Sequence, residues 1–423
     1  MNKLNILVVG GGGREHALIK AIAKSPRCGE LTCCPGNGGI GMEAERANIK
    51  ATDISGVVAL AKEKAVDLVV VAPDDPLVLG MVDALRAVGF KAFGPDKAAA
   101  IIEGSKAFSK ALMQTYGIPT AGYALFDNIE SAIAHIRGED CYPVVIKADG
   151  LALGKGVVIA ENLLEAEVAV RSMMEDKVFG ESGSRVVIEE FLTGPEVTVL
   201  AFCDGETLRP MVSAMDHKRA CEGNTGLNTG GMGVIAPNPH YTPDIARICE
   251  ETIFKPTLKA MKIEGRPFKG CLYFGLMLTS DGPKVIEYNC RFGDPEAQAV
   301  LSLLESDIVD IMLATIDGTL ADVPAIFSDR SAACVIMASD GYPGDYLKNI
   351  PIKGLDQRGG LEGVAVYHAG TVCEGGRFLT SGGRVLGVTA VADTLDEALE
   401  RAYAGVDKIH FEGAFCRRDI GKY

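Results

Sequence analysis

Hydrophobic residues in the first hundred positions form short unbroken runs, and longer stretches with helical spacing separate them. Asn5–Val9, Leu31–Cys34 and Leu68–Val71 are runs of the kind found in strands that are buried on both faces. Helices are predicted between and after these strands, at Glu15–Lys24, Ile54–Lys64 and Leu77–Val88. This alternation predicts an α/β unit in which helices cover both faces of a parallel sheet.

The remaining chain predicts three more units that mix helices and strands. Strands at Pro143–Lys147 and Val157–Ala160 flank a glycine-rich loop, and a tight turn joins Cys271–Thr279 to Pro283–Asn289 in a hairpin. Several strands and the helix Leu395–Val406 predict a small C-terminal unit. We therefore expect four domains, at residues 1–104, 105–192, 193–324 and 325–423.

Composition and charge narrow the class of protein. The 423 residues are 48% hydrophobic and 23% charged, which is typical of a globular chain and excludes a coiled coil, a collagen or a disordered protein. The formal net charge is −14, so we expect no nucleic-acid partner, because binding to phosphates needs a basic surface. A small anionic ligand would need a local group of Lys and Arg, which is feasible because salt screens charges beyond about 8 Å.

The cysteines and the N-terminus indicate a cytoplasmic protein. The 12 cysteines include no C-x-x-C pair, and Cys203, Cys271 and Cys334 lie in apolar runs, which is typical of core thiols in a reducing compartment. No His/Cys cluster has the spacing of a zinc site. The chain enters a strand at once, and it has no apolar run of about 18 residues, so we expect neither a signal peptide nor a membrane span.

Four glycines, Gly10 to Gly13, follow the first predicted strand and lead through Arg14 into a helix. One interpretation is a phosphate cradle, because glycine lets the backbone approach a ligand and a helix N-terminus offers N–H groups to an anion. The other is a tight turn that packs the helix on the sheet. A nicotinamide dinucleotide is disfavoured, because Glu15 replaces the third glycine of that fingerprint and no carboxylate follows the second strand.

A second glycine-rich segment lies between Val144 and Val157 and contains Lys147 and Lys155. It differs from the loop of P-loop nucleotidases, because no Ser or Thr follows Lys155 and a strand follows the loop. We interpret the segment as a lid between antiparallel strands that folds over phosphates, with Lys147 aimed at them. The alternative is that Lys147 is a solvated residue at a strand end.

Glu287 and Asn289 are two positions apart on a predicted strand, so their side chains share one face. A carboxylate and an amide oxygen together suit a hard cation such as Mg²⁺. Arg291, next on that face, can hold a phosphoryl group. The alternative is an internal ion pair between Glu287 and Arg291.

Two further polar segments are less specific when taken alone. The strand Arg185–Phe191 contains Glu189 and Glu190, which fit either a polar strand exit or contacts to a planar base and a ribose. The charged run at residues 216–219 precedes a Gly/Asn/Thr-rich loop at 224–233, which is either a loop that binds a polar substrate or a solvated loop.

With these segments in view, the chain resembles the phosphoribosylamine–glycine ligases (glycinamide ribonucleotide synthetases) of the ATP-grasp superfamily. The resemblance runs nearly end to end, and it is carried by G-G-R-E-H-A-L, G-S-K-A-F, I-K-A-D-G-L-A-x-G-K-G-V, E-E-F-L, D-H-K-R, N-T-G-G-M-G and N-C-R-F-G-D-P-E. It implies an α/β multidomain ATP-grasp fold: an N-terminal Rossmann-like parallel-sheet domain, an α+β lid, a central α+β domain and a small C-terminal α+β domain. Asp74 stands where the family usually has a glutamate, and Leu227 where it has a proline.

The resemblance also implies roles for particular residues. For ATP it implies the phosphate lysines Lys106 and Lys147, the lid residues Gly154, Lys155 and Gly156, the adenine hinge Glu189, Glu190, Phe191 and Leu192, and the ribose carboxylate Glu196. For the metal it implies Glu287 and Asn289, and for the reacting centre Arg291 and Asp294. For phosphoribosylamine it implies Gly12, Gly13, Arg14 and Asp74, with Asp216 and Lys218 close by.

The activity that the resemblance implies is the ATP-dependent joining of glycine to phosphoribosylamine through an acyl phosphate, in purine biosynthesis. The expected cofactors are ATP and Mg²⁺ or Mn²⁺, and the expected partners are these small molecules, with the chain as a monomer or a small homo-oligomer. Two alternatives are an ATP-grasp ligase with another acceptor amine and a module that senses a nucleotide without turnover. The intact set of Glu287, Asn289 and Arg291 argues against the sensor.

Overall fold

The computed structural model describes residues 3–151, 156–176 and 183–422. Its N-terminal domain is built on the predicted parallel sheet, in the strand order β3-β2-β1-β4-β5. The strands are β1 (Leu4–Gly10), β2 (Cys28–Pro35), β3 (Glu45–Arg46), β4 (Leu68–Val71) and β5 (Lys91–Phe93). Alternate residues of β1 belong to different hydrophobic clusters, Leu7 to one and Ile6 to the other, so both faces of the sheet are covered as expected.

The helices of this domain are α1 (Gly13–Ala23), α2 (Ile54–Glu63), α3 (Asp74–Leu79), α4 (Met81–Ala87) and α5 (Lys97–Gly104). The single helix expected at Leu77–Val88 is therefore wrong, because the chain breaks at Gly80. This glycine has a φ of +94°, a left-handed conformation that ends α3 before α4 begins. The chain therefore starts a second helix after Gly80, although the apolar pattern continues on both sides of this glycine.

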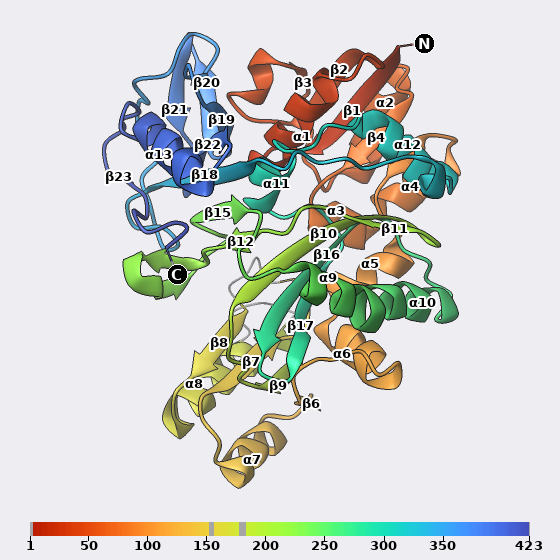
Figure 1. Cartoon of the computed structure of the whole chain (residues 1–423), viewed down its shortest axis with the longest axis vertical. Helices are drawn as coiled ribbons and strands as arrows, with labels where there is room; N and C mark the ends of the chain where they lie inside the picture. The colour runs from red at the N-terminus through yellow and green to blue at the C-terminus, as the bar shows by residue number, and fades with distance from the viewer. Residues whose placement is uncertain (1–2, 152–155, 177–182, 423) are drawn as a thin grey trace.

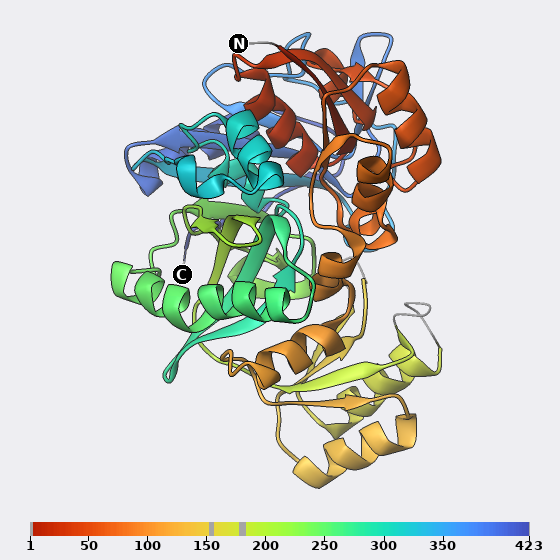
Figure 2. The same cartoon turned by 90° about the vertical axis from the view of Figure 1, so that its right-hand side faces the viewer.

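The lid is a four-stranded antiparallel sheet in the order β6-β9-β7-β8. Its strands are β6 (Tyr123–Phe126), β7 (Val144–Ala148), β8 (Val157–Ala160) and β9 (Val186–Glu190). Helices α7 (Ile129–Glu139) and α8 (Leu163–Met174) pack together on the sheet and give the lid a hydrophobic cluster of its own. Figures 1 and 2 show the lid extending away from the other domains.

The central domain contains the predicted hairpin, β16 (Lys269–Thr279) and β17 (Gly282–Asn289). Strands β10 (Glu196–Asp204) and β11 (Leu208–Pro210) extend this sheet in the order β11-β10-β16-β17. Its helices include α6 (Lys106–Thr115), α9 (Pro243–Cys249), α10 (Lys255–Ile263), α11 (Glu296–Val300) and α12 (Ile308–Asp317). The carboxyl end of β17 points toward the N-terminal domain, which brings the segment after it close to α1.

The C-terminal sheet takes strands from two distant parts of the sequence. Strands β18 (Ser331–Ser339), β19 (Ala365–His368) and β22 (Arg384–Ala392) are joined by β12 (Met215–Asp216) and β15 (Gly233–Ala236), in the order β12-β15-β18-β22-β19. The short strand β23 (Ala414–Phe415) pairs with β18, and α13 (Leu395–Val406) packs on this sheet. The polar loop at 217–232 is therefore held between two strands of the C-terminal sheet.

The N-terminal and C-terminal domains meet along α1, which packs against β19, and Figure 1 shows the two domains side by side. The backbone N–H of His368 donates to His16 Nδ1 at 2.8 Å, and Asn37 Nδ2 donates to the carbonyl of His368 at 2.7 Å. All three residues are buried. Among the described residues, no helix is both long and apolar enough to cross a membrane.

Phe292 joins the N-terminal and central domains, so its truncation tests their packing. Its ring is 1% exposed, stacks on Phe93 at 6.2 Å and meets Phe202 edge-on at 5.9 Å. We expect Phe292→Ala to lower the free energy of unfolding by about 3–5 kcal/mol in urea denaturation, because the space cannot refill. The control Leu164→Ala, at a side chain that is 72% exposed on α8, should change it by less than about 0.5 kcal/mol. Equal effects of the two substitutions would contradict this account of the interface.

Candidate functional site

One cavity of about 1060 Å³ lies where the domains converge. The N-terminal domain contributes Arg14 to its lining, the lid Lys147, the central domain Glu287 and the C-terminal domain Arg384. Of the predicted site residues, the lining includes Arg14, Asp74, Lys106, Lys147, Gly156, Glu189, Glu190, Phe191, Leu192, Glu196, Asp216, Lys218, Glu287, Asn289, Arg291 and Asp294. Gly154 and Lys155 lie outside the described residues.

Two buried lysines share one carboxylate in the part of the cavity beneath the lid. Lys147 on β7 and Lys110 on α6 each lie 3.0 Å from Glu189 Oε2. Lys147 also donates to the carbonyl of Ile286 at 3.1 Å, which ties the lid to β17. The other oxygen, Glu189 Oε1, is buried and has no hydrogen-bond partner among the described residues. The hypothesis of a solvated Lys147 is therefore wrong, because the amine is enclosed and paired.

Burial lowers the pKa of Lys110 to about 8, although the adjacent Glu189 opposes this shift. Lys106, one turn earlier on α6, donates to the carbonyl of Gly150 at 2.7 Å. Its amine therefore touches the start of the glycine-rich segment. Burial also lowers the pKa of Lys106, against the attraction of Glu287. Several buried amines thus face one end of the cavity. An anion bound there would offset the free-energy cost of removing these charges from water.

The end of β9 forms the wall between the lid and the central domain. Glu190 makes backbone and side-chain contacts to Gly122: its N–H donates to the Gly122 carbonyl at 2.9 Å, and its Oε2 accepts from the Gly122 N–H at 3.2 Å. The chain then passes through Phe191 and Leu192 to Glu196 at the start of β10. The predicted strand exit is thus also a lining segment of the cavity.

Lys218 bridges two carboxylates from different strands. Its Nζ lies 3.5 Å from Glu196 Oε2 and 3.5 Å from Glu287 Oε1. Burial opposes the charge of Lys218, but Glu287 and Glu196 outweigh burial and raise its pKa well above the ordinary value. Burial would raise the pKa of Glu287, but Lys218, Lys147, Lys106 and Arg291 together lower it to about 2. Glu287 is therefore a carboxylate that stays ionised among cations.

Arg291 has a different partner from the one proposed in the ion-pair alternative. Its Nη2 lies 3.1 Å from Oε1 of the buried Glu103 on α5, and it donates to Asn289 Oδ1 at 3.3 Å. Glu103 Oε2 also accepts from the backbone N–H of Cys290 at 2.7 Å. The internal ion pair between Glu287 and Arg291 is therefore not the arrangement, and Glu287 is left to Lys218. Asn289 and Glu287 both line the cavity, as their shared strand face predicts.

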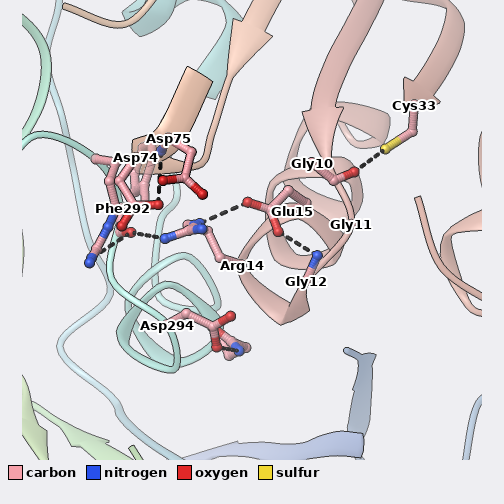
Figure 3. A network of polar contacts seen from close by, with 12 residues as sticks. Gly10, Gly11, Gly12, Arg14, Glu15, Cys33, Asp74, Asp75, Phe292 and Asp294 are labelled. Atoms are coloured by element: carbon pink, nitrogen blue, oxygen red, sulfur yellow. Dashed lines mark hydrogen bonds and ion pairs between the residues drawn. The ribbon is translucent and has the colours of Figure 1, made fainter. Parts of the chain in front are cut away.

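Arg14 lies between the N-terminal sheet and the segment after β17, as Figure 3 shows. Its Nε donates to Glu15 Oε1 at 2.8 Å, and its Nη1 donates to the carbonyl of Phe292 at 3.0 Å. Burial opposes the charge of Arg14, but Glu15, Asp294 and Asp74 together raise its pKa. The guanidinium thus has carboxylates on several sides.

The N-terminus of α1 differs from the predicted phosphate cradle. The backbone N–H of Gly12 donates to Glu15 Oε2 at 2.5 Å, so a carboxylate of the protein already occupies this position. Asp294 packs beside it, 3.3 Å from where a Cβ on Gly12 would lie. An added Cβ on Gly13 would collide with Nε2 of Gln298, so α1 starts close against α11. Gly12 and Gly13 precede Arg14 and are not among the residues that line the cavity.

The loop that follows β12 is held by the end of the chain. His217 Nε2 accepts from the backbone N–H of Gly421 at 3.1 Å, and its Nδ1 lies 3.3 Å from the carbonyl of Gly233. Burial and the nearby Arg417 lower the pKa of His217 to about 4, so the ring is neutral at pH 7. Arg417 itself donates to the carbonyl of Arg219 at 3.1 Å. The segment at residues 417–421 therefore fixes the backbone on both sides of Lys218.

Three family models match the chain in order along the sequence. Residues 4–103 match the N domain of phosphoribosylglycinamide synthetase, residues 104–297 its ATP-grasp (A) domain and residues 332–423 its C domain. A phosphoribosylamine–glycine ligase from Caldanaerobacter subterraneus is 48% identical over 417 residues, which cover 99% of both chains. One from Vibrio vulnificus is 49% identical over 422 residues, which cover 99% of this chain and 98% of that relative. The chain belongs to the phosphoribosylamine–glycine ligase family.

Solved structures agree with this assignment. The crystal structure of the phosphoribosylamine–glycine ligase from Thermotoga maritima is similar with a TM-score of 0.85 and 32% identity, and the match covers 99% of this chain and 100% of that chain. Biotin carboxylase from Campylobacter jejuni shares the fold with a TM-score of 0.75 at 14% identity, over 97% of this chain and 93% of that chain. The expected multidomain ATP-grasp fold is confirmed. Membership in this ligase family implies the use of ATP and a divalent metal ion.

Several lining residues of this phosphoribosylamine–glycine ligase family member were not found from the sequence. Lys110 and Glu103 are single charged residues within helices, and such residues are usually exposed. Asp149 is buried behind the lining and was visible in the K-A-D-G segment; its Oδ1 accepts from the backbone N–H of Ala107 at 3.0 Å and from the hydroxyl of Ser105 at 3.1 Å. Glu296 was visible as the last residue of G-D-P-E. Asp149 and Glu296 could have been identified because they belong to the motifs. The sequence around Lys110 and Glu103 gives no sign that these side chains are buried.

The depressed pKa of Glu287 predicts a specific dependence of stability on pH. Its folded pKa is about 2 and its ordinary value is 4.5, so its contribution to the free energy of unfolding is complete above pH 4.5 and is lost as the pH falls toward 2. We expect Glu287→Gln to flatten the acid limb of stability between pH 5 and pH 2, by up to about 2 kcal/mol in urea titrations. Asp281→Asn, at an exposed turn of the same hairpin, should leave the limb unchanged. Identical acid limbs for Glu287→Gln and the unmodified chain would contradict the charge arrangement described here.

Proposed function

We propose that this chain joins glycine to 5-phosphoribosylamine at the expense of ATP, giving glycinamide ribonucleotide, ADP and phosphate in purine biosynthesis. The observation that carries the proposal is the end-to-end membership in the phosphoribosylamine–glycine ligase family. The geometry supports it, since 16 of the 20 residues implied by the resemblance line a single cavity. Its volume of about 1060 Å³ is at the upper end of the range for ligand sites.

Glu287 and Asn289 fit a divalent cation. Mg²⁺ is commonly held by one or two protein oxygens together with substrate phosphates and water, so two ligands from one strand are sufficient. No group of three or more His, Cys, Asp or Glu that could hold a metal is found in the described parts of the chain, which agrees with a site that ATP phosphates complete. We propose Mg²⁺ or Mn²⁺ on these two residues, where the ion would neutralise phosphate charge.

ATP is proposed to bind between the lid and the central domain. Lys106 and Lys147 would contact its phosphates, and the backbone from Glu189 to Leu192 would face its adenine. The buried Glu189 Oε1, which has no partner among the described residues, suits an amino group donated by a base. Glu196 would accept from a ribose hydroxyl. The lid residues Gly154, Lys155 and Gly156 would cover the phosphates and exclude water.

The proposed chemistry has two steps. A carboxylate oxygen of glycine attacks the γ-phosphorus of ATP, and the bond to the β–γ bridging oxygen breaks, so that ADP leaves with the electron pair. The amine of phosphoribosylamine then attacks the acyl carbon of glycyl phosphate, loses a proton and expels phosphate. The repulsion between the anionic carboxylate of glycine and the phosphates of ATP opposes this transfer. Lys147, Lys106 and Arg291 would neutralise that charge and hold the two anions together. Asp294 would lie at the same reacting centre.

Phosphoribosylamine is proposed to bind near Arg14, with Gly12 and Gly13 as its support and Asp74 beside it. Asp74 is shorter than the usual glutamate, and Arg14, Asp74 and Asp294 interact electrostatically. Carboxylates suit the hydroxyl groups of a ribose better than its phosphate, because they can only accept hydrogen bonds when ionised. Asp216 and Lys218 border this region of the cavity.

We also propose a cytoplasmic location and a monomer or small homo-oligomer. All 12 cysteines are free thiols, and most are buried, which suits a reducing compartment. We propose the four domain ranges 1–104, 105–192, 193–324 and 325–423, although β15 pairs with β18 across the last boundary and so places β12 and β15 in the C-terminal sheet.

The deciding experiment follows ADP formation with each substrate left out in turn. We expect ADP only when ATP, glycine, phosphoribosylamine and a divalent metal are all present, together with a product that has the mass of glycinamide ribonucleotide. A faster reaction with another amino acid or another acceptor amine would replace the proposal with a different ATP-grasp ligase. The absence of phosphate release with every substrate present would favour a nucleotide sensor.

Glu287→Gln tests the proposed metal site separately. Loss of one charged ligand at the transferring phosphoryl group should lower kcat by about 10²–10³-fold and raise the Mg²⁺ concentration needed for half-maximal rate. Circular dichroism should show an intact fold. Asp281→Asn, the matched loss of a carboxylate at the tip of the hairpin, should keep the kcat of the unmodified chain. A normal rate in Glu287→Gln would remove the metal assignment.

A further inference from the structure

The end of the chain, residues 417–422, lies against the polar loop at 217–232. Within this loop, β13 (Arg219–Cys221) and β14 (Thr225–Asn228) form a small hairpin, and Figure 1 shows the C-terminus beside it. Residues 221–227 of the hairpin are exposed. Polar contacts, and not burial in a core, therefore determine where the hairpin lies.

An internal ion pair at the end of the chain makes two of these contacts. Arg417 Nε donates to Asp419 Oδ1 at 2.8 Å, and Arg417 Nη2 donates to Asp419 Oδ2 at 2.9 Å. The remaining nitrogen, Arg417 Nη1, donates to the carbonyl of Arg219 at 3.1 Å, and Asp419 Oδ2 also accepts from the backbone N–H of Gly223 at 2.8 Å. The hydrogen bonds from Arg417 lower the pKa of Asp419, so this carboxylate is ionised at neutral pH. The two-pronged pair is thus one rigid unit that holds β13 and the turn after it.

The neighbouring backbone of the same segment extends this hold in both directions. The N–H of Gly421 donates to His217 Nε2 at 3.1 Å. The N–H of Arg418 donates to Glu222 Oε1 at 3.1 Å. The end of the chain therefore contacts the polar loop before and after Lys218.

The segment is itself anchored to the C-terminal domain. Ile420 is 1% exposed and packs in a hydrophobic cluster with Ile235 of β15. The hydroxyl of Tyr403, on α13, donates to the carbonyl of Arg417 at 3.0 Å and accepts from the N–H of Ile420 at 3.0 Å. The polar loop thus takes its position from the C-terminal sheet through the last residues of the chain.

Lys218 depends on this support because its own side-chain contacts are long. Its Nζ lies 3.5 Å from both Glu196 Oε2 and Glu287 Oε1, and its side chain is 31% exposed. The backbone is held more closely, since the carbonyl of Lys218 accepts from the N–H of Thr229 at 2.8 Å. The position of the amine between the two carboxylates is therefore set by the backbone that carries it.

We propose that Arg417 and Asp419 are positioning residues for the transfer reaction, which act through the polar loop to keep Lys218 between Glu196 and Glu287. This inference rests on the proposed function, in which these two carboxylates meet the ribose and the metal ion. Arg417 lines the cavity, but its side chain is 3% exposed and all three of its guanidinium nitrogens already donate within the protein. The C-terminal domain thus contributes to the chemistry by holding a loop of the central cavity in place.

Steady-state kinetics of the full chain test the proposal. Arg417→Gln and Asp419→Asn should each lower kcat by about 10–100-fold, because a small displacement of a charged group at a reacting centre is costly. The KM for ATP should stay within twofold, because the phosphate lysines Lys106 and Lys147 lie on α6 and β7, outside the polar loop. Arg417→Lys should restore only part of kcat, because an ammonium group keeps the charge but not the planar fork.

A neighbouring ion pair provides matched controls. Arg418 Nη2 lies 2.6 Å from Asp407 Oδ1, and the two side chains are 50% and 59% exposed. Arg418→Gln and Asp407→Asn remove the same charges from the outer side of the segment. Both variants should keep kcat within twofold of the unmodified chain.

Hydrogen exchange separates loss of position from loss of stability. In Asp419→Asn, backbone amides at residues 219–228 should exchange at least about tenfold faster, while those of β1 stay unchanged. A purely structural role would instead speed exchange throughout the C-terminal sheet and leave kcat normal in the folded fraction.

A double variant, Arg417→Met with Asp419→Leu, guards against unfolding caused by a single unpaired charge. Both charges are removed together, so none is left buried without a partner and the fold should persist. Its kcat should remain as low as in the single variants, because the contacts to Arg219 and Gly223 are absent.

The outcomes distinguish this inference from the proposed function. A kcat within twofold of normal in Asp419→Asn and in the double variant, or global unfolding of every variant at this pair, would overturn the positioning role and leave the ligase intact. Failure of the unmodified chain to turn over would overturn the proposed function itself. Hydrogen exchange would then still show whether the end of the chain holds the polar loop.

Discussion

The fold must hold several lysine and arginine side chains in one cavity even when no phosphate is bound to balance their charge. A buried cation without a partner is costly, and several of the cations that line the cavity are held by carboxylates. Glu189 holds Lys147 and Lys110, Glu103 holds Arg291, and Glu287 shares Lys218 with Glu196. The carboxylates come from different elements of the fold, and their pairing determines which elements must meet. The architecture around the cavity follows from this balance of charge.

The strands of the central sheet deliver most of these groups. β17 ends in Glu287 and Asn289, and the turn after it carries Arg291 and Phe292 back toward α1. Phe292 anchors that turn in the core, while the charged residues on either side face the cavity. Hydrophobic packing thus fixes the backbone, and the polar side chains take their positions from it. The same division holds on the lid, where β7 is buried on one face by α7 and α8 and presents Lys147 on the other.

Much of this arrangement follows from the sequence, because it is encoded locally. The strands buried on both faces and the hairpin were predicted from runs and spacing, and the motif residues that line the cavity were predicted from the resemblance. Gly80 escaped prediction, because the apolar pattern runs through it and only the backbone shows the left-handed break. The pairing of β15 with β18 also escaped, since it joins segments far apart in the chain that share no local signal. Glu103 and Lys110 acquire their importance only through the partners that folding brings to them.

The shared C-terminal sheet has a consequence for the order in which the molecule can assemble. β15 is fully buried in the finished protein, and one of its edges is satisfied by β18. On the ribosome, β15 emerges well before β18, so this edge stays open while the intervening helices are being made. The nascent polypeptide therefore passes through a stage in which a hydrophobic strand is available to any neighbouring chain. Rapid translation of the intervening stretch, or a chaperone that shields it, would protect the protein from intermolecular pairing at that stage.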